Sequence, residues 1–226
     1  MNVLSLNMCG IRDRVKRKRL ANICSVHGVM FMRLQESRVS VVNMFELHSM
    51  WGNFSFDFAM SSARGLSGGI ISIWDPAAFC RNRIVSMENC LIVEGTWVFS
   101  KLRCYMVNVY APQSEAKKRD LWDFLLQFTQ DNPGEYVFFG DFNAVRHSGE
   151  RFGCGFSQVE ANHFNDFIDG AGLMEINSWM EEPTFESVLK KTIGNGSTEP
   201  AIYFKDKIKR LKVDLKAWWT GIVNDK

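Results

Sequence analysis

Apolar residues that alternate with polar ones, or that gather in short continuous runs, predict a series of β-strands along this chain. Clusters of Gly, Pro, Asn and Ser separate the runs, as expected for turns. The high share of aromatic residues, 13%, suits a large sheet core. The predicted strands cover residues 3–6, 29–34, 54–60, 70–74, 90–98, 102–110 and 136–139.

Apolar residues spaced three and four apart predict helices between these strands. One helix follows a basic run and ends near Val26. A second helix begins after Ser114, a residue suited to an N-cap, and ends at Asn132-Pro133-Gly134. Two further helices are predicted over residues 159–170 and 204–222.

The strands come in runs instead of alternating strictly with helices, which favours an α+β fold with layered sheets. A length of 226 residues is enough for one domain with a sizeable core and is short for two. The composition changes after Ser187, where Gly, Ser, Thr and Asn become frequent. We therefore expect one domain over residues 1–186, a loop over 187–202 and a basic amphipathic helical tail over 203–226.

Charge is distributed unevenly along the chain. The formal net charge of +2 does not by itself indicate a nucleic-acid partner. Two stretches, residues 12–19 and 205–216, are nevertheless strongly basic. Either stretch could face the phosphates of a nucleic acid, whereas a solvated helix face is the more frequent role of such a run. Charge alone favours the second interpretation.

The six cysteines are scattered without the paired spacing of a metal site, which favours a reducing compartment. The first residues have no basic lead-in before their apolar positions, so they do not resemble a signal peptide. No stretch is long and apolar enough to span a bilayer. We expect a soluble intracellular protein, nuclear or cytoplasmic, with no membrane partner; its oligomeric state is not predicted.

Polar side chains follow several of the predicted strands, where a scaffold can hold them rigidly beside a cleft. They are Asn7, Glu36, Tyr110, Asp141 and Asn143. Carboxylate and amide oxygens suit Mg²⁺, and an Asp beside an Asn can orient a water molecule near a phosphate. Each residue alone also fits a role as a turn former, a half-buried sheet residue or a solvated side chain. Only their combination indicates chemistry.

Read in order, four short motifs resemble those of the endonuclease/exonuclease/phosphatase superfamily. More narrowly, they are similar to the endonuclease domain of plant LINE-type retrotransposon polyproteins. Supporting similarity lies in Gly65-Leu-Ser67-Gly-Gly, Trp74-Asp, Trp122, Glu150-Arg151 and Pro183-Thr-Phe. The four motifs are Leu4-Ser-Leu-Asn7, Leu34-Gln-Glu36-Ser, Asn108-Val-Tyr110-Ala-Pro and Gly140-Asp141-Phe-Asn143.

The resemblance covers residues 1–185 and implies a four-layer α/β sandwich of the DNase I type, with its site at one end of two packed sheets. It implies that Asn7 and Glu36 hold Mg²⁺, or Mn²⁺ in its place. It further implies that Tyr110 contacts the scissile phosphate, that Asp141 activates the attacking water and that Asn143 binds a phosphate oxygen. DNA would be the partner. We expect backbone contacts from Arg17, Lys18 and Arg19, which follow Asn7 closely in the sequence.

The sequence departs from this family after Phe185. The resemblance calls for an Arg-Leu-Asp-like strand and a Ser-Asp-His sequence, and neither is present. We therefore expect the last strands of one sheet to be missing, with an unpaired edge and impaired activity. His147 follows the Gly140-Asp-Phe-Asn motif, but a loop histidine in that position is more often incidental. Arg33 lies in a predicted buried strand, where it could pair with an acidic neighbour.

Three alternatives to a nuclease remain open. The first is a nucleic-acid-binding module without catalysis, which the basic run favours. The second is a retroelement fragment without function that folds poorly. The third is a phosphatase of the same superfamily that acts on lipids or inositol phosphates. The Glu150-Arg151 pair and the Gly-Leu-Ser-Gly-Gly context make the third the weakest of these.

Overall fold

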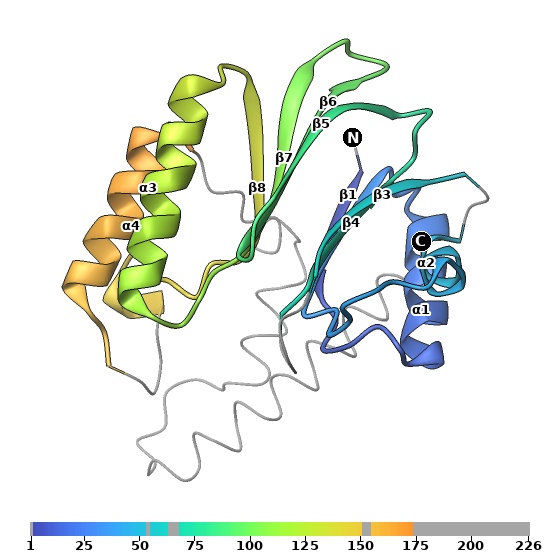
Figure 1. Cartoon of the computed structure of the whole chain (residues 1–226), viewed down its shortest axis with the longest axis horizontal. Helices are drawn as coiled ribbons and strands as arrows, with labels where there is room; N and C mark the ends of the chain where they lie inside the picture. Colours follow the sequence, from blue (N-terminus) through green and yellow to red (C-terminus); the bar gives the residue numbers. More distant parts are fainter. Residues whose placement is uncertain (1, 53–54, 63–67, 151–154, 174–226) are drawn as a thin grey trace, which may run out of the picture. The chain divides into compact units, whose positions relative to one another are not determined.

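The structure is a computed structural model that describes residues 2–52, 55–62, 68–150 and 155–173. The chain divides into two compact units, Met1–Leu173 and Met174–Lys226, and all described residues belong to the first (Figure 1). The expected boundaries at residues 186 and 202 lie outside the described residues, as do the predicted tail helix and the Pro183-Thr-Phe motif.

Two four-stranded sheets form the centre of the first unit (Figure 1). The first sheet has the strand order β1-β2-β4-β3, with β1 and β2 parallel and the other pairs antiparallel. Its strands are β1 (Val3–Asn7), β2 (Phe31–Gln35), β3 (Asp57–Ser61) and β4 (Ile70–Trp74).

The second sheet has the order β5-β6-β7-β8, and its only parallel pair within the described residues is β7 with β8. The long segment between β7 and β8 contains a helix, because a parallel pair needs a crossover connection. The strands are β5 (Phe79–Ser86), β6 (Cys90–Trp97), β7 (Arg103–Tyr110) and β8 (Glu135–Asp141).

Two helices cover the outer face of each sheet, which gives four layers (Figure 1). Helices α1 and α2 pack on the first sheet, and α3 and α4 pack on the second. A short 3-10 turn, Ser148–Glu150, precedes α4. The helices are α1 (Arg14–Val26), α2 (Met44–Trp51), α3 (Glu115–Asp131) and α4 (Gln158–Gly170). The described residues thus form the predicted α+β, four-layer sandwich.

The alternation of side chains along each strand produces three apolar cores, one for each contact between layers. In β2, Met32 and Leu34 face α1 and α2, whereas Phe31 faces the second sheet. The inter-sheet core is aromatic: the ring of Phe31 stacks on Trp74 with centroids 5.5 Å apart. Both faces of β2 are therefore buried, which explains its nearly continuous apolar sequence.

Arg33 interrupts that apolar run and lies in the inter-sheet core, fully buried. Its guanidinium lies over the ring of Phe139, and its three nitrogens have no hydrogen-bond partner. The neighbouring Ser72 hydroxyl, across the β2–β4 ladder, is also without a partner. The suggested acidic neighbour is thus not found among the described residues. Burial without compensation lowers the pKa of Arg33.

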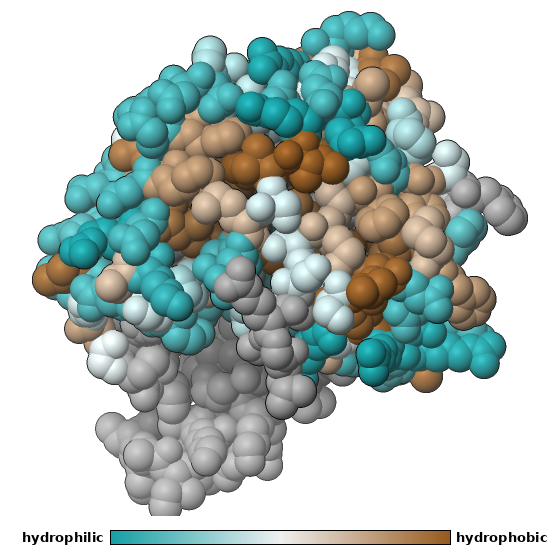
Figure 2. Space-filling view, viewed as in Figure 1, coloured by the Kyte–Doolittle hydropathy of each residue, from teal (hydrophilic) through white to brown (hydrophobic). Residues whose placement is uncertain are grey.

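Strands β1 and β8 each pair on one side only within the part of the chain that the structure describes. Residues Tyr136–Asp141 of β8 are all half-buried, unlike the buried centre of β7. Figure 2, viewed as Figure 1, shows apolar residues gathered over the strands and hydrophilic residues over α3 and α4. The expectation that one sheet lacks its last strands stays a prediction, because residues 174–226 lie outside the description.

Helix α2 and strand β5 were not predicted from the sequence, whereas the other described helices and strands match predicted segments. Helix α3 begins after Ser114 as predicted, although the Ser114 hydroxyl makes no capping hydrogen bond. Among the described residues, no helix has both the length and the apolar character needed to cross a membrane.

Candidate functional site

The carboxyl ends of the two parallel strand pairs bring the predicted site residues together. Asn7 is the last residue of β1. Glu36 directly follows β2, the strand that pairs with β1. Tyr110 and Asp141 are register partners at the ends of β7 and β8. Because parallel strands end at the same edge of a sheet, each sheet contributes one pair of polar side chains to this edge.

Glu36 connects the two sheets. Its Oε1 accepts a hydrogen bond of 2.8 Å from the amide of Asn7 and a longer one, 3.4 Å, from the hydroxyl of Tyr110. Its Oε2 forms an ion pair of 3.2 Å with the half-exposed guanidinium of Arg38. The Asn7 hydrogen bond is the main reason why the pKa of Glu36 is lowered. Glu36 is therefore a carboxylate at neutral pH.

Tyr110 lies between the two carboxylates of the site. Burial raises the pKa of its phenol most, and the charges of Glu36 and Asp141 raise it further. The hydroxyl therefore keeps its proton at neutral pH and can act as a hydrogen-bond donor. The register of β7 and β8 places Asp141 directly beside Tyr110.

Asp141 and Asn143 form a tight turn after β8. Asp141 Oδ1 accepts a hydrogen bond of 3.0 Å from the Asn143 backbone, and the Asn143 amide donates one of 2.7 Å to the Ala111 carbonyl. Gly140 precedes them with φ of 132°, and a Cβ there would lie 1.8 Å from the Val109 carbonyl oxygen. Only glycine fits this position, so the close approach of β7 to β8 fixes where the turn begins.

Lys118 holds this turn from the outer layer. Its buried ammonium donates a hydrogen bond of 2.6 Å to the Asn143 carbonyl and pairs with the Glu160 carboxylate. These contacts join α3, α4 and the turn at one point. The side-chain amide of Asn143 has two hydrogens, and the bond to Ala111 uses one of them.

Backbone strain is concentrated around the site. Five described residues other than glycine have positive φ, and four of them border it. Such conformations cost on the order of 1–3 kcal/mol each and persist where the surrounding structure enforces them. The four residues are Cys9 (φ 47°), Glu36 (51°), Arg38 (56°) and Asn143 (47°).

Three further hydrogen bonds support the segment around Glu36. Gln35 Nε2 donates a hydrogen bond of 2.6 Å to Asn108 Oδ1 across the buried space between the sheets. The backbone amides of Ser37 and Arg38 donate to the carbonyls of Gly69 and Gly68. The described end of the Gly-Leu-Ser-Gly-Gly motif thus braces the loop that presents Glu36, whereas Gly65-Leu-Ser67 lies outside the described residues.

The basic run divides into one structural arginine and several exposed side chains. Arg17 is buried, and its guanidinium donates to the carbonyls of Ile11 and Arg12 and to the Ser49 hydroxyl. This corrects the expectation that Arg17 faces phosphates, because the side chain is buried and its Nε and Nη1 donors are bound within the protein. Lys18 and Arg19 are exposed on α1, as a contact with the sugar-phosphate backbone of DNA would require.

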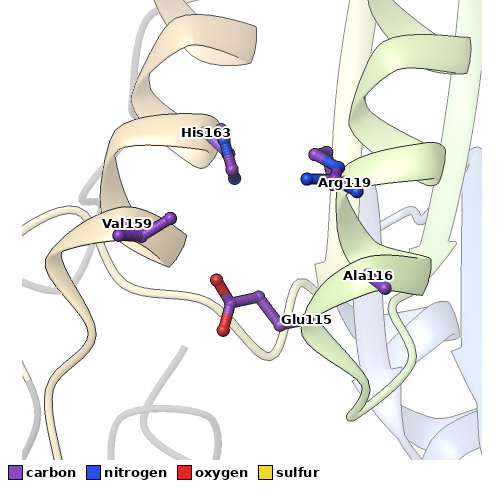
Figure 3. A pocket seen from close by; sticks show the side chains of 5 residues that line it. All are labelled: Glu115, Ala116, Arg119, Val159 and His163. Carbon is purple, nitrogen blue, oxygen red and sulfur yellow. The ribbon is translucent and has the colours of Figure 1, made fainter.

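Other groups do not join the site. His147 is exposed beyond the Asp141–Asn143 turn, and no contact with the site is found for it. Within the described ranges, no group of three His, Cys, Asp or Glu side chains could hold a metal. A hollow of about 300 Å³ between α3 and α4 is lined by Glu115, Ala116, Arg119, Val159 and His163, and none of the predicted site residues (Figure 3).

No known family model matches the sequence, and no curated protein matches it as a relative. Solved structures do match. An AP endonuclease from Leishmania major, LMAP, matches with a TM-score of 0.53 and 14% identity over 75% of this chain. The catalytic domain of APE2 from Xenopus laevis matches with 0.55 and 13% over 74%. The mannosyl-6-phosphatase Bt3783 from Bacteroides thetaiotaomicron matches with 0.52 and 11% over 72%.

The chain has the DNase I-like fold. At these identities the likeness concerns the fold alone. The match spans 65% of the Leishmania chain, 67% of the Xenopus chain and 68% of the Bacteroides chain. The matched region therefore spans only part of the length of each of these three proteins.

Three residues around the candidate site were missed from the sequence. Lys118 lies three residues before Leu121 and four before Trp122, on the buried stripe of α3, and that spacing was an available signal. Arg38 was not singled out, since its importance depends on a loop conformation with positive φ. Glu160 pairs with Lys118 across two helices, and nothing in the sequence links them.

Proposed function

We propose that this chain forms a phosphodiesterase domain that acts on nucleic acid, with its site at the carboxyl ends of β1, β2, β7 and β8. The observation that carries the proposal is the hydrogen bond between Tyr110 and Glu36 across the two sheets, with Asp141 beside them as the register partner of Tyr110. Two carboxylates, a protonated phenol and two amides at one edge suit the hydrolysis of a phosphate ester.

The donor set fits Mg²⁺, or Mn²⁺ in its place. Glu36 offers an ionised carboxylate, and Asn7 Oδ1 accepts from the Cys9 amide and, at 3.4 Å, from the Cys9 thiol, a weak donor that a cation would displace. Magnesium takes one or two carboxylates and completes its shell with water and substrate oxygens, so this sparse set of hard ligands is sufficient. When bound, the ion would offset the charge on the phosphate and the leaving oxygen.

Each side chain then has a distinct task. The Asp141 carboxylate accepts a proton from the attacking water, and its position is fixed by the turn it forms with Asn143. The side-chain amide of Asn143 donates to one phosphate oxygen, and the hydroxyl of Tyr110 exchanges its long hydrogen bond to Glu36 for one to another phosphate oxygen. Asn7 keeps Glu36 ionised and oriented.

Activity is impaired in this proposal because the 226 residues contain no Ser-Asp-His sequence. The loss of one member of a catalytic unit usually costs most of the rate. We also propose a retroelement origin, which rests on the order of the motifs in the sequence. A reverse transcriptase reading frame next to this gene is expected, and its absence from every copy of the locus would contradict this origin.

A second candidate is a nucleic-acid-binding module without catalysis. The exposed Lys18 and Arg19 favour it, since they lie on the helix that starts beside the site. This candidate predicts salt-sensitive binding that persists without Mg²⁺ and weakens when Lys18 and Arg19 are neutralised.

Plasmid nicking by the full chain separates the two candidates. We expect slow nicking of supercoiled DNA that needs Mg²⁺ and disappears in Asp141→Ala. Asp131→Ala, an exposed position at the far end of α3, serves as the matched control and should nick as the unaltered protein does. Nicking that survives in Asp141→Ala would contradict the assigned site. No nicking from a protein that melts cooperatively would favour the binding module.

A further inference from the structure

Three apolar side chains are exposed together near the first turn of α2. Val41 is 80% exposed, Met44 54% and Phe45 72%, within five residues of the sequence. The next turn of α2 is conventional, because Leu47 and Met50 are buried in the core. Isolated exposed apolar residues are common on protein surfaces, but such a cluster usually marks a contact surface.

This cluster adjoins the rim of the candidate site. Arg17 donates to the Ile11 and Arg12 carbonyls and pairs with Glu46, the residue after Phe45. Ile11 and Gly10 in turn donate to the carbonyls of Ser37 and Glu36. The Glu46–Arg17 ion pair and these hydrogen bonds therefore link the segment that carries Phe45 to the loop that holds Glu36.

The surroundings of the cluster are positively charged. Exposed Arg12 and Arg14 lie on the loop and first turn of α1, and Arg38 lies next to Gly10. The nearby carboxylates are engaged: Asp13 caps α1, Glu46 pairs with Arg17, and Glu36 pairs with Arg38 and offsets its charge, so Arg12 and Arg14 carry most of the positive charge. A phosphate-bearing partner is thus favoured over an acidic or neutral protein surface. Three side chains also cannot supply the roughly 800 Å² that each partner buries in a stable protein interface.

We propose that Val41, Met44 and Phe45 form an apolar platform on which unpaired bases of a nucleic acid stack, while Arg12, Arg14 and Arg38 contact its backbone. An exposed aromatic ring flanked by cations is suited to single strands, because every base offers a flat apolar face. This inference rests on the proposed function and narrows it: the substrate is a nucleic acid with unpaired or distorted bases beside the scissile bond.

Fluorescence anisotropy with the full chain in EDTA tests this without hydrolysis. The probes are a labelled single strand, a fully paired duplex and the same duplex with a central bulge. We expect Phe45→Ala to weaken binding of the single strand and the bulged duplex by about tenfold and to leave the paired duplex nearly unchanged. Its salt dependence should match that of the unaltered chain, because no charge is removed.

Phe99→Ala is the matched control. Phe99 is 77% exposed, but it lies in the turn before β7, at the end of that strand opposite Tyr110. It should change none of the three affinities. Since both rings are exposed, both variants should melt like the unaltered protein.

Three results would overturn the platform. They are an unchanged affinity of Phe45→Ala for all probes, an equal loss for paired and unpaired probes, and a loss of self-association in sedimentation without any change in nucleic-acid binding. The last would identify a protein contact. If the unaltered chain binds no nucleic acid, the proposed function fails as well. If it binds all three probes and Phe45→Ala changes none, only the platform fails.

Discussion

The buried ammonium of Lys118 donates a hydrogen bond to the backbone carbonyl of Asn143, and the two atoms are 2.6 Å apart. The helix layer thereby holds the turn that presents Asp141. Glu160 compensates the buried charge of Lys118. Removing one partner of a buried pair leaves the other charge unpaired, whereas removing both avoids this cost.

Lys118→Met should therefore destabilise the protein by about 3–5 kcal/mol in urea unfolding, because it leaves Glu160 and the Asn143 carbonyl without their partner. Lys118→Met combined with Glu160→Leu should recover part of this loss. A single variant as stable as the unaltered chain would show that the pair does not hold the turn.

Arg33 provides the opposite case. Its charge is buried without a hydrogen-bond partner, and the stacking on Phe139 returns only about 2 kcal/mol, less than a buried charge costs. Arg33→Met removes the buried charge and keeps the volume, so we expect stability to rise by about 1–4 kcal/mol. Arg17→Met is the matched control. It should destabilise, since Arg17 is a buried arginine whose donors are used by Ile11, Arg12 and Ser49. A loss of stability in both variants would refute this distinction.

Gly140 is expected to be intolerant of any side chain. Gly140→Ala would place a Cβ 1.8 Å from the Val109 carbonyl oxygen at a φ of 132°, so the β7–β8 ladder has to separate. We expect a loss of about 3 kcal/mol or more in thermal or urea unfolding. Gly149→Ala, where a Cβ has open space, should be nearly neutral. Equal stability of the two variants would contradict the described strand register.

The acid titration of Glu36 depends on Asn7. The Asn7 hydrogen bond is the largest cause of the lowered pKa of Glu36, whose ordinary value is 4.5. Since the folded pKa is below the unfolded one, this contact stabilises the fold above that value and is lost as the pH falls through the folded pKa. Carbon-detected NMR should find a midpoint below 4.5 in the unaltered chain, and Asn7→Ala should raise it. An unchanged midpoint in Asn7→Ala would argue that the hydrogen bond is not formed in solution.

Much of the fold could be predicted from the sequence, because the residues that recur with the period of a strand or a helix are the ones that the structure buries. The missed strand β5 shows where this fails. Its centre is exposed and includes Arg81 and Arg83, so it lacks the alternation of a half-buried strand. Helix α2 is short, and its exposed Met44 and Phe45 obscure the apolar stripe of Leu47, Met50 and Trp51.

The site was predictable only in part. The strand ends identified Asn7, Glu36, Tyr110 and Asp141 as candidates, and the structure brings these four together. The contacts that hold them are made across layers, such as Tyr110 with Glu36 and Lys118 with Glu160. A local pattern cannot specify such pairs, because their separation in the sequence is long. The burial of Arg17 did have a local signal, because Arg17 lies three residues before Leu20 and seven before Cys24 on the buried face of α1.

The central claim is that Glu36 and its neighbours form a site for a divalent cation, and it can be tested even if hydrolysis is slow. Electron paramagnetic resonance of Mn²⁺ added to the full chain measures bound metal directly. We expect saturable binding that Mg²⁺ displaces, that Glu36→Gln abolishes and that Glu135→Gln, at the far end of β8, leaves unchanged. Equal Mn²⁺ binding by the Glu36→Gln and Glu135→Gln variants, or no binding by the unaltered chain, would contradict the claim.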